Sequence, residues 1–396
     1  MNVERIAAEA REGKAVRYLR VRDHTLKVVT DSIEADGLVT ETFCPWGMLD
    51  VVETAEVDRP GLTIVDLVHD ADGIDSLLDR TAATTAVGEY ELTRGYRLPR
   101  YDGEDHSVFV LQDVHSDERA ALIRTEHRIT IVRPASTLGD RWLTRVIRDI
   151  ATRIAKAEGA LILHSSAFAY QDGAYLVIGD SGAGKSTTAI ALARLLPSAG
   201  WMGNDRMHLD RRDGGYRVTA CPLPLAVNKG SLDVMGVTGF ESWPVRAGLP
   251  KPGSDWDQFQ GEDKLKLSSL EVREYLGVRV VPSMPLAGVI LPRVDLRAAY
   301  SLEPSAPDHT AAVVTRNCFS LDDNLFGENW LRVAVEQRVE PPSVTGFLEH
   351  IARLPVLRAT VSGPADVARL AKDFRALVGD GPAADAYTRP FADAEV

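Results

Sequence analysis

Residues Gly179–Thr187 read GDSGAGKST, and their types and spacing are those of a phosphate-binding loop. Gly179, Gly184, Lys185 and Ser186 satisfy the pattern G-x-x-x-x-G-K-[ST]. Glycines let the backbone bend so that N–H groups converge on phosphate oxygens. The lysine of such a loop reaches the β- and γ-phosphates, and its Ser hydroxyl ligates magnesium. The pattern predicts ATP and Mg²⁺ as cofactors, bound by Gly179, Asp180, Ser181, Gly182, Ala183, Gly184, Lys185, Ser186 and Thr187.

Motifs that would accompany the loop in other nucleotide-binding classes are missing from the sequence. GTPases of the translational type recognise guanine with N-K-x-D, whereas Asn228–Ser231 reads NKGS and lacks the aspartate. Transporter-type ATPases carry LSGGQ, which does not occur in this chain. ATP is therefore expected rather than GTP, and phosphoryl transfer is favoured over energy coupling.

Three features around the loop carry a resemblance to a known family. His164 lies in an apolar, strand-like run one predicted hairpin before the loop. The loop is of the G(D/E)SGxGKS type, and GNDR (Gly203–Arg206) follows its predicted helix. Together they resemble the HPr kinase/phosphorylase family, whose catalytic core is similar to that of phosphoenolpyruvate carboxykinase. The resemblance implies a P-loop kinase core with His164 facing the γ-phosphate.

The same resemblance assigns the other site residues. Pro222–Met235 (PLPLAVNKGSLDVM) is similar to a P-x-P-x-x-x-K-x-x-S segment of relatives of this kinase, which nominates Lys229. The family's acidic pair becomes Asn204–Asp205 here, so Asp205 alone would serve as base and metal ligand. The similarity covers roughly 161–235, and HPr itself is not expected as the substrate. The implied catalytic residues are His164, Lys185, Asp205 and Lys229, and the implied metal ligands are Ser186 and Asp205.

The function predicted from these residues is ATP-dependent phosphorylation of a hydroxyl acceptor. The acceptor could be a small metabolite, an amino acid or a Ser/Thr of a peptide. An alternative from another class is a nucleotide-binding regulator that hydrolyses ATP slowly and acts through a protein partner, which Asn204 favours. A carboxykinase-like lyase is a third alternative, although it needs further Arg, Lys and His residues that do not align.

Each singled-out residue also has an ordinary structural interpretation. His164 could be a satisfied core histidine, and Asp205 a turn residue. Lys229 could be a solvated surface lysine, as could Lys264 and Lys266, although one of the last two could reach a phosphate. The acidic stretch Leu321–Asn324 could hold a second metal or simply be solvated.

The elements expected around these residues predict an α/β fold. A helix beginning near Ser136 is expected because apolar residues recur every four positions from Leu138 to Ile154. A tight hairpin should lead into the loop and an amphipathic helix should follow it. Residues 244–262 read as a long Gly- and Pro-rich loop at the substrate entrance. Further strands are expected within 15–31, 61–68, 106–113, 120–134 and 285–292, and further helices within 269–277, 330–337, 344–353 and 365–378.

Four segments are expected along the chain. They are a mixed, strand-rich N-terminal domain (1–135) that helps select the acceptor, a P-loop kinase core (136–300), a C-terminal α/β region with helical patterns, packed on the core (301–378), and a disordered tail (379–396).

Composition narrows the class of protein. The 396-residue chain has a formal net charge of −12, which disfavours a nucleic-acid scaffold. Its 3 cysteines show no CxxC spacing, so neither a disulfide framework nor a zinc site is expected. No signal-peptide pattern or bilayer-length apolar run occurs. A cytoplasmic bacterial protein without a membrane partner is expected, and assembly into a homo-oligomer is compatible with the resemblance.

Overall fold

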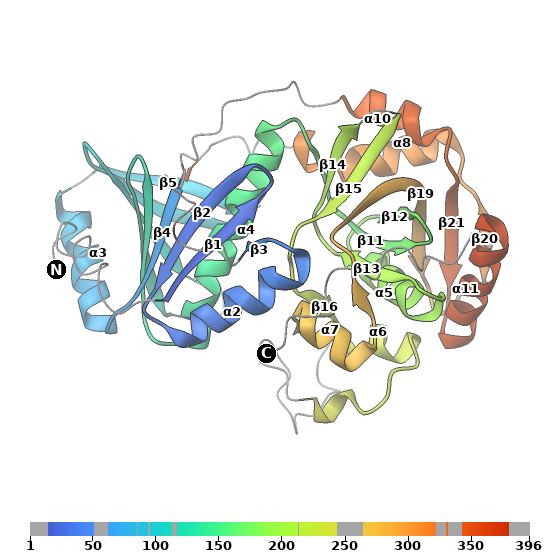
Figure 1. Cartoon of the computed structure of the whole chain (residues 1–396), viewed down its shortest axis with the longest axis horizontal. Coiled ribbons are helices and arrows are strands. Elements are labelled where there is room, and N and C mark those ends of the chain that lie inside the picture. The colour runs from blue at the N-terminus through green and yellow to red at the C-terminus, as the bar shows by residue number, and fades with distance from the viewer. Residues whose placement is uncertain are drawn as a thin grey trace. The chain divides into compact units, whose positions relative to one another are not determined.

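The computed structural model describes residues 15–50, 62–84, 86–93, 96–112, 117–212, 214–243, 264–321, 330–331 and 343–379. The expected entrance loop at 244–262, the acidic residues 322–324, the helix expected over 332–337 and the tail beyond 379 lie outside these residues. The chain is mixed α/β, which confirms the predicted fold class at that level (Figure 1).

The chain divides into two compact units, and it passes between them more than once. The first unit consists of Met1–Gly159 and Phe319–Pro341, and the second of Ala160–Cys318 and Pro342–Val396. The helix that begins after Ser136 therefore belongs with the first unit and not with the expected 136–300 segment.

The first unit is built on one 9-stranded sheet. Strands β2, β4 and β9 are parallel neighbours, and the remaining pairings are antiparallel. The spatial order is β3 (Leu49–Asp50), β1 (Ala15–Val21), β2 (His24–Thr30), β4 (Leu62–Val68), β9 (Arg128–Arg133), β8 (Arg119–Arg124), β7 (Ser107–Gln112), β6 (Tyr96–Asp102) and β5 (Ala86–Thr93).

Both faces of this sheet are covered by helices because its central strands are apolar on both sides. Along β4, Leu62 and Ile64 point to the core shared with α2 (Ile33–Phe43) and α4 (Thr137–Ala157). The alternate residues Val65 and Leu67 point to the core shared with α3 (Ala71–Thr84). This two-residue alternation is what a pleated strand produces.

Trp330 completes the first core from a distant part of the sequence. Its ring stacks on Tyr90 and meets Phe109 edge-on, with centroid distances of 5.0 Å in both cases. Its indole N–H donates to the Asp149 carboxylate at 2.9 Å, and its carbonyl oxygen accepts from Arg124. The segment after the second unit's Cys318 is therefore an integral part of the first unit.

The second unit contains a 10-stranded sheet and a two-stranded one. Parallel strands β12 and β19 lie at the centre, and β19 pairs in parallel with β21. The order is β10 (Leu161–Leu163), β14 (Met207–Arg212), β15 (Gly215–Ala220), β19 (Ser283–Val294), β12 (Gly173–Ile178), β11 (Ser165–Tyr170), β13 (Gly200–Gly203) and β18 (Arg279–Val280), with β21 (Val356–Val361) and β20 (Ser301–Pro304) branching from β19. The small sheet joins β16 (Leu225–Val227) to β17 (Leu265–Leu267).

Helices surround this sheet (Figure 1). Phe374 of α11 packs edge-on against Tyr175 and Phe168, which stack on each other across β11 and β12. This aromatic cluster fixes the hairpin that leads toward the glycine-rich loop. The helices are α5 (Lys185–Leu195), α6 (Lys229–Val234), α7 (Ser269–Leu276), α8 (Pro307–Arg316), α10 (Val344–Ile351) and α11 (Pro364–Val378). Short 3₁₀ turns occur at η1 (Cys44–Trp46), η2 (Phe240–Ser242) and η4 (Phe319–Leu321).

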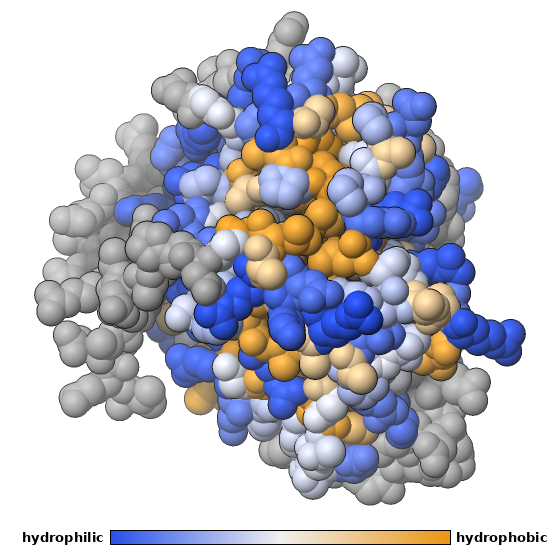
Figure 2. Space-filling view, turned by 90° about the vertical axis from the view of Figure 1, so that its right-hand side faces the viewer, coloured by the Kyte–Doolittle hydropathy of each residue, from blue (hydrophilic) through white to orange (hydrophobic). Residues whose placement is uncertain are grey.

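The C-terminal region is not purely helical, because β20 and β21 lie within it and join the sheet. On the face that carries α8, β20, β21 and α11, apolar side chains gather between hydrophilic ones (Figure 2). Among the described residues, no helix is both long and apolar enough to cross a bilayer.

Candidate functional site

The glycine-rich loop, residues 179–186, connects the central strand β12 to helix α5. The first helical hydrogen bond runs from the Thr188 N–H to the Gly184 carbonyl oxygen, at 2.8 Å. The three preceding amide groups, of Lys185, Ser186 and Thr187, therefore have no partner inside the helix. The N-terminal end of a helix is a favourable place for an anion to bind, because its N–H groups and the positive end of the helix dipole face the bound anion.

Gly184 is required by both the backbone angle and the packing of the loop. It has a φ of 93°, and a Cβ built there would lie 2.2 Å from Val294 Cγ2. The same region of β19 holds the loop through the Val294 N–H, which donates to the Ala183 carbonyl oxygen at 3.2 Å. The loop is therefore supported by the strand beside it.

Lys185 lies within the loop that its own backbone helps to form. Its Nζ donates to the carbonyl oxygens of Gly179 at 2.8 Å and Asp180 at 3.1 Å, and the residue is only 9% exposed. Burial lowers the pKa of Lys185, and the charges of Asp205 and Asp180 oppose that effect without cancelling it. The positive charge of Lys264 lowers the pKa of Lys185 further, so Lys264 also contributes to the electrostatics of this site.

The side chains of His164 and Asp205 lie within hydrogen-bonding distance of each other. His164 Nε2 lies 3.2 Å from Asp205 Oδ1, with the histidine side chain 27% exposed and the aspartate side chain 60% exposed. The carboxylate is therefore accessible to solvent, and the histidine side chain is only partly buried.

The backbone at Asp205 is in an uncommon conformation. Its φ is 70°, and the Arg206 N–H donates to the Asn204 carbonyl oxygen at 2.8 Å, which closes a three-residue turn. A residue with a Cβ at positive φ costs about 1 kcal/mol relative to glycine. Such strain tends to occur at functional sites, where it holds a side chain in a required direction.

Opposing effects set the charge of Asp205. Desolvation by the surrounding residues raises the pKa of this carboxyl group, whereas the hydrogen bond and charge of His164 lower it. Arg206 and Lys185 lower it further, and the net result is a pKa below the usual aspartate value. Asp205 is therefore a carboxylate at neutral pH, and its electrostatic coupling to Lys185 links the pair to the loop.

The oxygen atoms near the loop are of the chemical type that binds magnesium. Ser186 Oγ lies 3.4 Å from Ser166 Oγ, and Asn204 Oδ1 is buried without a hydrogen-bond partner. Mg²⁺ takes oxygen ligands and is usually bound through one or two carboxylates together with phosphates. In the described part of the chain, no cluster of three or more His, Cys, Asp or Glu side chains could hold a metal by itself. A metal ion held by Asp205 and Ser186 would therefore need phosphate oxygens to complete its coordination.

Lys229 begins α6, where its Nζ pairs with Asp233 at 2.8 Å. Ser231, two residues further along, contacts the loop helix. Its Oγ lies 2.7 Å from Thr187 Oγ1, and its own N–H donates to the Asn228 side chain at 2.9 Å. The hydroxyl pair attaches the segment containing Lys229 to the residue that follows Ser186.

Two residues that no sequence pattern identifies, Arg316 and Asn317, also contact the loop. Arg316 Nη2 lies 3.3 Å from Asp180 Oδ2, and Asn317 Nδ2 donates to Asp180 Oδ1 at 3.3 Å. The hydrogen bond from Arg316 lowers the pKa of Asp180. Both residues lie at the end of α8, far from the loop in sequence, and neither belongs to a local motif that could have identified them.

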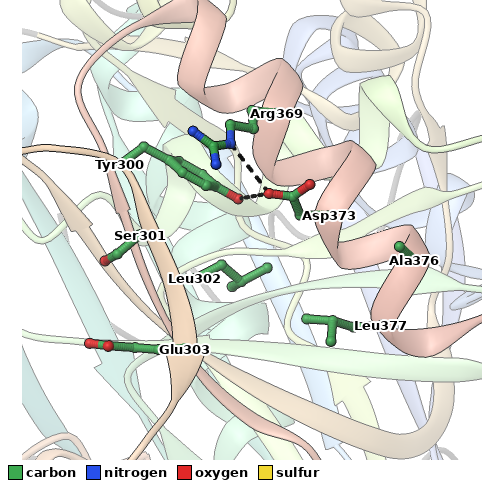
Figure 3. Close-up of a pocket in the computed structure, with 8 residues that line it drawn as sticks. All are labelled: Tyr300, Ser301, Leu302, Glu303, Arg369, Asp373, Ala376 and Leu377. Carbon is green, nitrogen blue, oxygen red and sulfur yellow. Dashed lines mark hydrogen bonds and ion pairs between the residues drawn. The ribbon is translucent and has the colours of Figure 1, made fainter.

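A separate pocket of about 510 Å³ lies between β20 and α11 (Figure 3). The Tyr300 hydroxyl donates to Asp373 at 2.8 Å, and the Arg369 guanidinium lies 4.3 Å from the centre of the Tyr300 ring. Leu302 extends from the strand toward the helix (Figure 3). None of the residues expected from the sequence to form a site lines this pocket.

No protein-family model and no curated protein sequence matches this chain.

Proposed function

We propose that the second unit is an ATP-dependent kinase of the HPr kinase type that phosphorylates a hydroxyl group. One observation carries this proposal: the His164–Asp205 pair lies beside the glycine-rich loop. Ser165, next to His164, pairs with Ile178, next to Gly179, and the Ser166 hydroxyl lies 3.4 Å from that of Ser186. A phosphate-binding loop supplies the donor side of a phosphoryl transfer. A carboxylate held in a strained turn supplies a group for the acceptor side.

The transfer would proceed as follows. The acceptor oxygen bonds to the γ-phosphorus while the bond from that phosphorus to the β,γ-bridging oxygen breaks, and ADP leaves with the electron pair. The acceptor's proton passes to the Asp205 carboxylate. Because the transition state is loose, a base of lowered pKa suffices to orient the hydroxyl and take the proton late. His164 keeps the carboxylate in place.

Charge neutralisation would fall to the loop. The Lys185 ammonium and the amides at the start of α5 would stabilise the β- and γ-phosphate oxygens. When bound, Mg²⁺ supplies additional positive charge at those oxygens, with Asp205 and Ser186 as the protein ligands that would hold it. Lys185 would have to turn from the Gly179 and Asp180 carbonyl oxygens toward the nucleotide.

Phosphorus NMR tests this function directly. The protein is incubated with magnesium-ATP and a pool of hydroxyl metabolites and Ser/Thr peptides. We expect a new phosphoester resonance that disappears with Lys185→Ala, and that appears more slowly with His164→Ala while ATP still binds. Orthophosphate alone would instead favour the regulator with slow ATP hydrolysis. No consumption of ATP would exclude both.

A further inference from the structure

The carboxylate of Asp180 stands in an unfavourable place for a triphosphate site. It belongs to the glycine-rich loop, so a nucleotide bound there would bring several negative charges close to it. In the structure its charge is neutralised by Arg316 and by the Asn317 amide.

Arg316 holds Asp180 only loosely. Its Nε and Nη2 lie 3.4 and 3.3 Å from the two carboxylate oxygens, longer than the ~2.8 Å of a strong charge-assisted pair. The two side chains are 55% and 62% exposed, and exposed pairs contribute little to stability. The guanidinium can therefore exchange this acceptor for a more highly charged one.

The backbone of Arg316, by contrast, is fixed beside the site. The next residue, Asn317, is only 4% exposed and ends α8. Its carbonyl oxygen accepts the His164 N–H at 2.8 Å, and its Nδ2 donates to Val313 O at 2.9 Å as well as to Asp180. Asn317 thus connects the loop to the strand that carries His164. Arg316 is a long cationic side chain on a rigid base, within reach of the loop.

We propose that Arg316 is a further catalytic residue, whose guanidinium leaves Asp180 and binds phosphate oxygens of the nucleotide. The proposal rests on the kinase function above, because it requires a triphosphate in the loop. Arg316 neutralises charge as the bond to the β,γ-bridging oxygen breaks, and it neither gains nor loses a proton. Arginine suits this role because its planar fork matches phosphate oxygens. Asp180 is then a positioning residue that holds the arginine in the absence of nucleotide.

Two substitutions that break the same ion pair distinguish this role from a structural one. Arg316→Ala removes the cation, and Asp180→Asn removes the anion but leaves Arg316 free. We expect Arg316→Ala to weaken ATP binding at least tenfold, and ADP binding less. Asp180→Asn should instead tighten ATP binding. The measurement is displacement of a fluorescent ADP analogue by ATP or ADP with Mg²⁺, combined with single-turnover transfer rates.

Arg358→Ala is the matched control, because this arginine is 48% exposed and pairs with Glu303 at 2.9 Å, away from the loop. Arg358→Ala should change neither the affinity for ATP nor the rate of phosphoryl transfer. Arg316→Lys should recover only part of the ATP affinity that Arg316→Ala loses. Equal weakening by Arg316→Ala and Asp180→Asn, or no effect of Arg316→Ala, would overturn the role of Arg316 and leave the kinase function standing. If the wild-type protein binds no nucleotide, both the role of Arg316 and the kinase function are wrong.

Discussion

His164 Nε2 lies 3.2 Å from Asp205 Oδ1, although the loop and α5 separate the two residues in sequence. Antiparallel pairing of β11 with β13, in which Ala167 faces Gly203, brings the two strand ends to the same edge of the sheet. The short distance between His164 and Asp205 therefore depends on the register of the sheet and on the turn at Asp205.

Asp205→Gly should abolish transfer and should be more stable than Asp205→Asn, which also lacks the carboxylate. Glycine adopts the observed φ of 70° without the penalty of a Cβ, which amounts to about 1 kcal/mol. The melting temperature of Asp205→Gly should exceed that of Asp205→Asn by roughly 2–4 °C for a domain of this size. The transfer rate should fall to background because the carboxylate is gone. Thermal unfolding and the phosphorus NMR assay give the two values.

Asp205→Asn is the control for this substitution, because it keeps the side-chain shape and the strain but removes the charge. It should lose transfer without gaining stability, and nucleotide should still bind through the loop. If either variant phosphorylated the acceptor at the wild-type rate, the base would have to lie elsewhere.

Gly184→Ala should prevent nucleotide binding, whereas Gly182→Ala should only weaken it. Both glycines have positive φ, at 93° and 78°, so both alanines carry backbone strain. Only at position 184 would the new Cβ also collide with Val294, and a shift there would move the start of α5. Isothermal titration with magnesium-ATP measures both affinities. Equal affinities would mean that the Val294 contact does not set the loop geometry.

ATP with Mg²⁺ should raise the melting temperature more than GTP with Mg²⁺. A ligand that binds only the native state adds about 2.7 kcal/mol of stability at one hundred times its dissociation constant. Chelating the metal with EDTA should reduce the ATP shift, because the carboxylates would then face the phosphates without a cation. Greater protection by GTP would reverse the nucleotide assignment.

The local structure around the loop could be predicted from the sequence because short-range patterns determine it. The β11–β12 hairpin, the start of α5 at Lys185 and the Ser136 cap of α4 all lie close to where the patterns place them. In α4 the Ser136 hydroxyl accepts the Gly139 N–H at 2.8 Å, a bond that only neighbouring residues are needed to form.

The remaining features depend on pairings between distant residues. Arg316 and Asn317 reach Asp180 because α8 ends beside β10, where Leu163 bridges to Cys318. Nothing near Arg316 in the sequence indicates that partner. The edge strand β20 was missed for a similar reason, since only β21 supports its four residues, Ser301–Pro304. A turn at Asp205 is one of the interpretations that the sequence offers, but its positive φ could not be foreseen, because positive φ most often occurs at glycine.

Trp330→Ala should destabilise the first unit by about 3–5 kcal/mol, the usual effect of removing a buried aromatic side chain. Trp330 is 2% exposed and contacts two aromatic rings of the same core. Trp330→Phe retains a ring and loses the N–H bond to Asp149, so its effect should be smaller, about 2 kcal/mol. Urea unfolding followed by circular dichroism measures both. Equal stability of all three proteins would show that this segment does not support the core.

The position of Trp330 also constrains the order in which the protein folds during synthesis. The first unit needs a residue that emerges from the ribosome only after all of 160–318. At typical elongation rates this is a delay on the order of ten seconds. Through that interval the nascent N-terminal sheet has an aromatic core exposed at Tyr90 and Phe109, the rings on which Trp330 later packs. A fragment that stops at Gly159 would keep that surface permanently, so it is expected to recruit chaperones or aggregate, whereas the full chain covers it.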